Sequence, residues 1–268
     1  MTDATATVPA AGALHVESTG SGPPLVLLHG WALHGGLFAP LVPALARTHR
    51  VHVVDLPGHG HSLPVEPYTL DAVVARLDER FARAAPLTVL GWSLGATVAL
   101  YWARHAPAHV ARLVLVCPTP RFVATDDWAH AMAADTLARF ADELTVAYRL
   151  TLQRFLTLQV QGSDEGRATL AALRGALFAR GEPAPAALAA ALDLLAAADL
   201  RALVAQVAAP ALVVTGSRDT LTPPAAGAWL ARALPAARHV EIEGAAHAPF
   251  LSHRRRFDAA LEGFLDAR

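Results

Sequence analysis

Short runs rich in valine and leucine alternate along this chain with segments of helical periodicity. Consecutive apolar positions in runs of this length are typical of strands whose two faces are both covered by helices. We predict strands at residues 25–28, 51–55, 87–90, 113–117, 211–215 and 239–242, with a weaker one at 13–18. Helices are predicted at residues 70–84, 96–105, 225–233 and 254–267. This order predicts an α/β fold with a mainly parallel sheet flanked by helices.

The alternation is interrupted between residues 118 and 209. That segment has several helical patterns and no convincing strand, and it is far longer than a crossover connection requires. Prolines punctuate its entry and its exit, at Pro118, Pro120 and Pro210. We therefore expect an α/β core built from residues 1–118, with a loose tail at 1–12, and residues 210–268. A helical lid is expected at residues 119–209.

The composition limits the classes of function. Of the 268 residues, 54% are hydrophobic and 17% charged, which supports a sizeable core, and the net charge of −1 gives no general attraction to nucleic acid or to an anionic membrane. No transmembrane helix is expected. All 22 basic residues are arginine, which excludes a P-loop lysine, a Schiff-base lysine and a Ser–Lys dyad. Cys117 is the only cysteine, so no intrachain disulfide can form, as suits a cytoplasmic protein. We interpret it as a small buried hydrophobe.

The segment Gly91-Trp92-Ser93-Leu94-Gly95 matches the pattern G-x-S-x-G between a predicted strand and a predicted helix. In this context the serine sits on a sharp turn that projects its hydroxyl from the sheet at a helix N-terminus, which favours developing negative charge. The flanking glycines let the chain pass close by without a Cβ clash. We therefore predict Ser93 as a nucleophile.

A serine nucleophile needs a base, and the base needs an orienting acid. Asp219 and His247 each follow a predicted strand, in the order serine, acid, histidine. Because ligand sites in open α/β sheets gather at the strand carboxyl ends, we expect Ser93, Asp219 and His247 to meet there. The sequence also offers rivals, namely Asp126 and Asp127 for the acid and His253 and His239 for the base.

Acyl transfer also requires donors for an oxyanion. The early strand ends at Leu28-His29-Gly30-Trp31, so the backbone N–H groups of Trp31 and Leu94 are expected to form the oxyanion hole, and the Trp31 indole to line the acyl pocket. His59 and His61 have a spacing compatible with metal ligands, but no third ligand is evident, so no metal site is expected.

Over nearly its whole length the chain resembles the α/β-hydrolase superfamily, through the His29-Gly30-Trp31 motif, the Gly58/Gly60/Ser62 loop, the G-x-S-x-G turn, Asp219 and His247. Further stretches resemble the pimeloyl-[acyl-carrier protein] methyl ester esterases of biotin synthesis: Gly30 to Leu33, Arg154 to Gln159 and His247 to His253. The resemblance implies hydrolysis of a carrier-bound methyl ester, with acyl-carrier protein as partner. It also implies a substrate pocket that includes Trp31, Ser93, Leu94, His247 and the lid residues Phe155, Leu156, Thr157, Leu158 and Gln159.

In the resembled family, basic lid residues meet the acidic carrier. Arg154 and Arg167 match such positions, and Arg149 and Arg174 lie near others. With Arg180, these make five arginines against Asp164 and Glu165, a local positive excess suited to an acidic partner or equally to a solvated helix face.

The alternatives are a broad-specificity short-chain carboxylesterase, a carbon–carbon bond hydrolase that also uses serine, and a lidded small-molecule receptor on a hydrolase scaffold. No metal or organic cofactor is expected, and the protein is expected to act as a cytoplasmic monomer.

Overall fold

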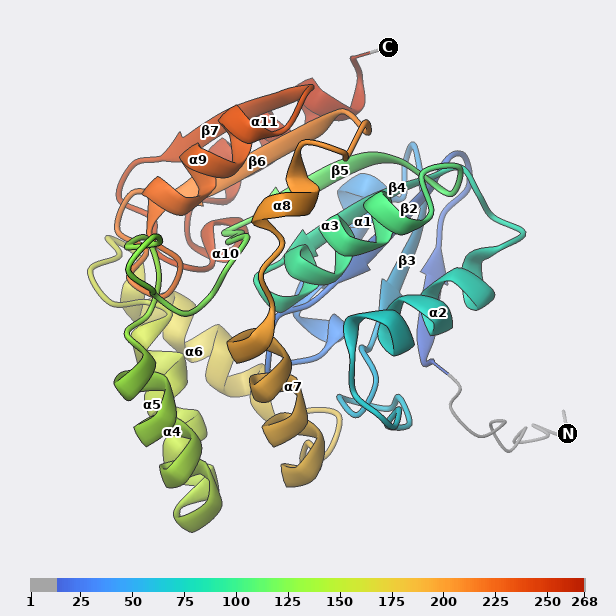
Figure 1. The fold of residues 1–268 in the computed structure, drawn as a ribbon. Helices are drawn as coiled ribbons and strands as arrows, with labels where there is room; N and C mark the ends of the chain where they lie inside the picture. Colours follow the sequence, from blue (N-terminus) through green and yellow to red (C-terminus); the bar gives the residue numbers. More distant parts are fainter. Residues whose placement is uncertain (1–13, 268) are drawn as a thin grey trace, which may run out of the picture.

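A seven-stranded sheet forms the centre of the protein, whose computed structural model describes residues 14–267. The strands lie in the order β1-β3-β2-β4-β5-β6-β7 (Figure 1). All neighbouring strands are parallel except the pair β1 and β3. The strands span Val16–Thr19 (β1), Pro24–Leu28 (β2), Arg50–Val54 (β3), Leu87–Trp92 (β4), Val110–Val116 (β5), Ala211–Gly216 (β6) and Ala237–Ile242 (β7).

The prediction of an α/β fold with a mainly parallel sheet is confirmed. Each predicted strand is present, and its ends agree with the prediction or differ by at most three residues. The weakest of them, expected at 13–18, is the antiparallel edge strand β1 at Val16–Thr19, where three of four residues are exposed. An edge strand that faces water lacks the continuous apolar run of a central strand, which explains its weak signal. The expected tail at 1–12 lies outside the described residues.

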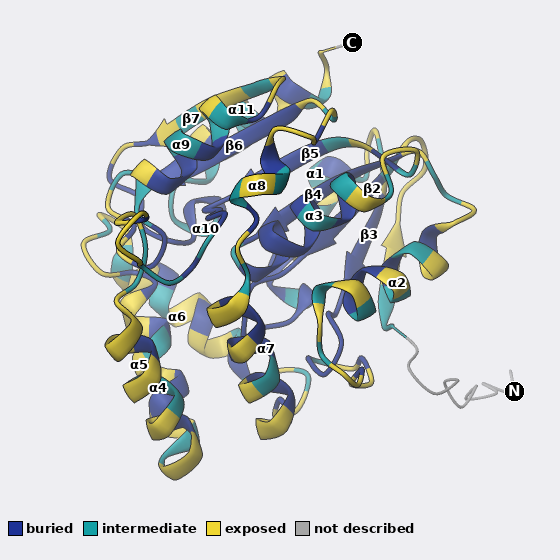
Figure 2. Ribbon diagram, viewed as in Figure 1, coloured by how far each residue is buried: buried dark blue, intermediate teal, exposed yellow. Residues whose placement is uncertain are grey.

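Helices cover both faces of the sheet, and the buried residues concentrate between the layers (Figure 2). Outside the segment between β5 and β6, the longer helices are α2 (Leu70–Phe81), α3 (Leu94–His105), α9 (Pro224–Ala233) and α11 (Arg254–Leu265). They correspond to the four helices predicted from the sequence. Five short elements have too few residues to show periodicity and were not predicted: η1 (Gly35–Phe38), α1 (Val42–Leu45), α8 (Arg201–Val204), α10 (Pro249–Ser252) and the turn bridges of residues 121–132. No helix within residues 14–267 is long and apolar enough to cross a membrane.

Five helices lie between β5 and β6, namely the short α8 and four longer ones that gather on one side of the sheet (Figure 1). The four longer ones are α4 (Ala134–Val146), α5 (Tyr148–Leu158), α6 (Gly166–Leu177) and α7 (Pro185–Ala197). Each buries leucines on one face, as a helix packed on one side does, but Val146 of α4 and Leu150 and Leu158 of α5 are exposed. We refer to these four helices as the helical layer.

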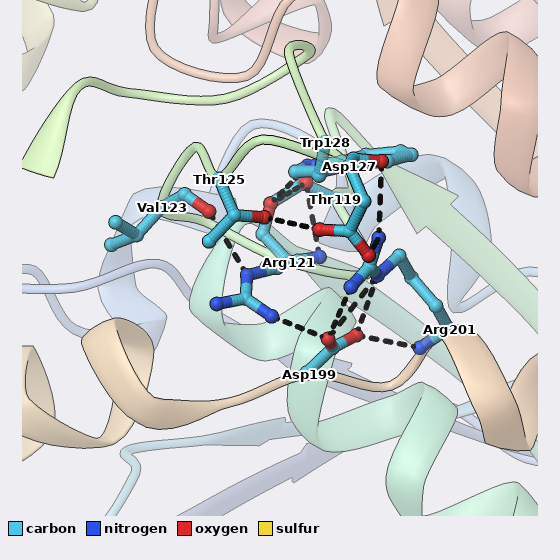
Figure 3. A network of polar contacts seen from close by, with 8 residues as sticks. All are labelled: Thr119, Arg121, Val123, Thr125, Asp127, Trp128, Asp199 and Arg201. Carbon is cyan, nitrogen blue, oxygen red and sulfur yellow. Dashed lines mark hydrogen bonds and ion pairs between the residues drawn. The ribbon is translucent and has the colours of Figure 1, made fainter.

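The two chain segments that enter and leave the helical layer are tied together near the sheet (Figure 3). Arg121, on the way in, donates to Asp199, on the way out, at 2.6 Å, and the N–H of Leu200 donates to the carbonyl of Pro120 at 2.8 Å. Arg201 reinforces this contact by binding Asp199 at 2.7 Å and Asp127 at 3.0 Å. The base of the helical layer is therefore held as one unit.

Candidate active site

Ser93 lies on a strained turn between β4 and α3. Its backbone has φ 55° and ψ −117°, in the left-handed region that non-glycine residues rarely adopt. The glycines on either side are required by close backbone approach, because a Cβ on Gly91 would lie 2.2 Å from the carbonyl of Gly95, and one on Gly95 would lie 2.2 Å from the carbonyl of Leu28. The sequence G-x-S-x-G thus closes the turn and leaves the serine partly exposed.

Asp219 and His247 form a buried pair at the same edge of the sheet. The loop after β6 carries Asp219 and the loop after β7 carries His247, with 2.7 Å between Asp219 Oδ2 and His247 Nδ1. An ionised carboxylate can only accept, so Nδ1–H donates and Nε2 is left free to act as a base. Burial alone would raise the pKa of Asp219, but the charge and hydrogen bond of His247 hold it below its ordinary value.

Backbone contacts fix the position of His247 from two directions. Its N–H donates to the carbonyl of Gln159 at 3.0 Å, and its carbonyl accepts from the indole of Trp92 at 2.7 Å. Trp92 directly precedes Ser93, and Gln159 directly follows the last residue of α5. The histidine is thereby held between the serine turn and the helical layer.

The rival acids and bases lie elsewhere. Asp126 and Asp127 are exposed, and Asp127 is bound to Arg201. His239 lies on β7 against Thr215, at 2.9 Å. His253 lies between α10 and α11 and contacts Ser252.

Ser93 and His247 open into a pocket beneath the helical layer. Apart from these two residues and Thr136, its wall is apolar and comes largely from the helical layer and the segment leading to it. The remaining lining residues are Trp31, Phe122, Met132, Leu137, Phe140, Phe155, Leu158, Leu192, Leu195 and Leu221. Such a wall suits an aliphatic chain whose reactive end reaches Ser93.

The expected oxyanion donors lie beside the serine. A Cβ on Gly30 would come within 3.3 Å of the Ser93 Cβ, so the loop carrying Trp31 lies directly against the turn. Within residues 14–267, the backbone N–H groups of Trp31 and Leu94 have no acceptor. Two free N–H groups next to a serine are the arrangement that stabilises an oxyanion.

The indole of Trp31 joins the core to the helical layer. It donates to the carbonyl of Leu188 in α7 at 2.9 Å, and its ring packs edge-on against Phe155 and Phe140 at centroid distances of 4.9 and 5.5 Å. Trp31 therefore lines the pocket and also contacts the helices α4, α5 and α7 that cover it.

Of the run from Phe155 to Gln159, two side chains reach the pocket. Phe155 and Leu158 line it, one turn apart on α5. Leu156 is fully buried in the core, and Thr157 faces outward with its hydroxyl on the carbonyl of Gln153. Gln159 is 1% exposed and holds His247 through its backbone, so in this conformation it does not line the pocket. Helical periodicity explains this division, because only residues three or four apart share a face.

The five arginines between residues 149 and 180 differ in exposure and in pairing. Arg167 and Arg174 are exposed, and Arg149 and Arg154 are exposed in ion pairs with Glu182 and Glu143. Arg180 is different: it turns inward onto Asp55 and Glu17, so the counted excess of positive charge is smaller at the surface.

One cluster of possible metal ligands lies near the edge strand β1. The carboxylate of Asp55 and ring nitrogens of His15 and His61 lie within 4.8 Å of one another, but the Asp55 oxygens are held by Arg180 and by backbone N–H groups, so the cluster fits an ion poorly.

Cys117 is fully buried beside Asp219, and burial raises the pKa of its thiol well above the ordinary value. That thiol is therefore unsuited to be a nucleophile.

One polar neighbour of the pair was not predicted. Thr222, three residues after Asp219, has its hydroxyl 2.8 Å from the Asp219 carboxylate. The only signal in the sequence was a hydroxyl residue close behind the candidate acid.

Comparison with known proteins adds three kinds of similarity. Residues 23–254 match the family model described as alpha/beta hydrolase fold. Proteins named pimeloyl-[acyl-carrier protein] methyl ester esterase are similar over almost their full length. The relative from Chromobacterium violaceum is 46% identical (95% of this chain, 99% of the relative), that from Xanthomonas axonopodis pv. citri 48% (94% and 98%), and that from Nitrosomonas europaea 43% (93% and 98%).

Among solved structures, an esterase from Exiguobacterium antarcticum superposes with a TM-score of 0.85 at 22% identity, covering 95% of this chain and 96% of that one. A bromoperoxidase from Bacillus anthracis gives 0.86 at 22%, covering 95% of each, and at such identities these two show the fold alone.

Proposed function

The chain belongs to the α/β-hydrolase family, and from this premise we propose that it is a serine carboxylesterase that hydrolyses the methyl ester of pimeloyl-[acyl-carrier protein] in biotin synthesis. The observation that carries the reaction is the opening of Ser93 and His247 into a pocket whose wall is otherwise nearly apolar. The relatives of that name, at 43–48% identity over nearly the whole chain, support the substrate.

In the proposed mechanism His247 Nε2 takes the hydroxyl proton of Ser93 as the serine oxygen attacks the ester carbonyl. The N–H groups of Trp31 and Leu94 donate to the oxyanion of the tetrahedral intermediate. When the C–O bond breaks, His247 returns the proton to methanol and an acyl-serine remains. Water attacks this ester with His247 again as base, and the products are the free carboxylate and Ser93. Asp219 keeps the imidazole tautomer and stabilises its charged form.

The pocket and its surroundings suit the two ends of such a substrate. The aliphatic chain packs against residues such as Phe155 and Leu158, where apolar burial contributes about 0.8 kcal/mol per methylene. We propose residues 119–209 as the lid that covers it. The exposed arginines Arg149, Arg154, Arg167 and Arg174 are proposed to attract the acidic carrier protein, chiefly by raising the rate of encounter. Action as a cytoplasmic monomer stays a prediction.

The test compares hydrolysis of methyl pimeloyl-carrier protein with that of p-nitrophenyl butyrate, for the wild type and for Ser93→Ala. Efficient cleavage of the carrier-bound ester by the wild type, abolished in Ser93→Ala, supports the proposal. Cleavage of the small ester alone leaves a short-chain esterase and removes the substrate assignment. If folded wild-type protein cleaves neither ester, the proposed function is wrong and the result favours the alternative of a small-molecule receptor.

A further inference from the structure

Thr222 is a buried residue of the loop that joins β6 to α9, and the mechanism above does not use it. Only 2% of it is exposed. Its backbone N–H donates to Asp219 Oδ1 at 3.0 Å, next to the N–H of Leu221 at 2.9 Å. Its hydroxyl lies 2.8 Å from the other carboxylate oxygen, Oδ2. Thr222 therefore contacts both oxygens of the acid.

The position of the hydroxyl proton follows from the neighbours of Oγ1. Besides Asp219 Oδ2, these are the carbonyl of Cys117 at 3.0 Å and His247 Nδ1 at 3.3 Å. A hydroxyl has one proton and two lone pairs. If the proton went to the Cys117 carbonyl, a lone pair of Oγ1 would face the charged oxygen of Asp219 at 2.8 Å, which is repulsive. The hydroxyl therefore donates to Asp219, the charged acceptor.

With this proton placed, the carboxylate of Asp219 accepts from four donors. Two backbone N–H groups reach Oδ1, while the Thr222 hydroxyl and His247 Nδ1–H reach Oδ2. A carboxylate has about four lone-pair sites, so its hydrogen-bonding capacity is filled. Rotation about the bond to the carboxyl group would break several of these bonds at once.

The threonine is itself held firmly. Its side chain is branched at Cβ, which restricts χ1. Pro223 follows it and limits its backbone to extended conformations, and Pro224 begins α9. The hydroxyl is thus fixed by the fold and does not depend on a bound substrate.

We propose that Thr222 is a positioning residue of the catalytic site, whose hydroxyl holds the Asp219 carboxylate in the orientation that aligns the His247 imidazole with Ser93. The inference rests on the proposed function, because it takes the roles of Ser93, Asp219 and His247 from it. Without the hydroxyl, Oδ2 keeps His247 as its one donor, so the carboxylate is held less firmly. Its less neutralised charge then stabilises the protonated imidazole more strongly.

The test measures kcat and KM for p-nitrophenyl butyrate as a function of pH in Thr222→Val, Thr222→Ser and the control Thr169→Val. Thr169 is also buried, but its hydroxyl donates only to the backbone carbonyl of Glu165, at 2.8 Å. Loss of a hydrogen bond to a charged group predicts a roughly tenfold lower kcat in Thr222→Val, with KM unchanged. The acidic inflection of kcat/KM is expected at higher pH than in the wild type. Thr222→Ser keeps the hydroxyl, so its kcat and the pH of its acidic inflection are expected to be those of the wild type. The control Thr169→Val is expected to match the wild type in the same two quantities.

Two results would overturn the inference: wild-type kcat and pH profile in folded Thr222→Val, or a serine variant as impaired as the valine variant at an unchanged melting temperature. If Thr222→Val does not fold, Thr222→Ala removes the same hydroxyl without adding a methyl group and is judged by the same criteria. Ser93→Ala on the same ester keeps the two proposals distinguishable. Activity that survives in Ser93→Ala contradicts the proposed function, whereas activity that needs Ser93 but not the Thr222 hydroxyl contradicts only this inference.

Discussion

Replacement of Arg180 by methionine should destabilise the protein through the buried carboxylate of Asp55. Arg180 lies between α6 and α7 and binds Asp55, which directly follows β3 in the core. The Arg180 side chain is 10% exposed and that of Asp55 is 0% exposed. Its NH1 group lies 3.0 Å from each carboxylate oxygen. Arg180 is permanently charged and therefore faces the buried carboxylate as a full opposite charge.

The magnitude follows from what Asp55 keeps in the variant. Breaking a buried ion pair from one side costs about 3–5 kcal/mol, because the other charge stays buried without a partner. Asp55 retains hydrogen bonds from the N–H groups of Gly35 and His61, at 2.8 and 2.9 Å, so we expect the lower end, about 3 kcal/mol. For 268 residues the unfolding entropy is about 0.56 kcal/mol/K, which converts this loss into a melting temperature about 5 °C lower.

The assay is thermal unfolding followed by circular dichroism, with Arg149→Met as the matched control. Arg149 pairs with Glu182 at the surface, where the side chains are 68% and 46% exposed, so its loss should cost less than about 1 kcal/mol. Equal melting temperatures for Arg180→Met and Arg149→Met would refute the reasoning.

The pH dependence gives a second check on the same pair. Burial would raise the pKa of Asp55, but the charge of His29, the N–H groups of His61 and Gly35 and the guanidinium of Arg180 together hold it below the ordinary 3.8. In the wild type the stabilisation is therefore complete above that pH and is lost as the pH falls through the lowered pKa. In Arg180→Met the unpaired carboxylate takes up a proton at a higher pH. The stability gap between variant and wild type should therefore narrow from about pH 8 to about pH 5. A gap that widens over this range would contradict the assignment of the loss to Asp55.

Three further predictions concern the turn, the base of the helical layer and the proposed carrier surface. Gly95→Ala should cost about 3 kcal/mol or more, because its Cβ would lie 2.2 Å from the carbonyl of Leu28, and the soluble yield and melting temperature would show it. Asp199→Asn weakens the partly exposed pairs with Arg121 and Arg201 and should cost about 1 kcal/mol; hydrolysis of p-nitrophenyl butyrate at 25 °C should be unchanged, and a large loss of activity would contradict this. Arg167→Glu should raise KM for the carrier-bound ester by roughly fivefold while leaving the small ester unaffected, and an equal effect on both substrates would argue against a carrier contact.

The sheet and the order of the catalytic groups along the chain could be predicted from local sequence patterns. The central strands are continuous apolar runs, a local signal that no distant residue can change. The turn around Ser93 is likewise local, because the two flanking glycines are needed wherever such a turn forms. Since the carboxyl ends of parallel strands share one edge, the positions of Asp219 and His247 after their strands were enough to predict that they meet.

The contacts between the core and the segment that joins β5 to β6 could not be predicted from the sequence. From the sequence, Arg180 was grouped with the other arginines between residues 149 and 180. In the folded protein it binds Asp55, which lies 125 residues away in the chain. In the same way, Gln159 belongs to a run expected to line the pocket, yet its backbone holds His247 and its side chain is buried. The physical reason is the same for both. Burial and hydrogen bonding of a side chain depend on which distant surfaces pack against it, and no local periodicity encodes that choice.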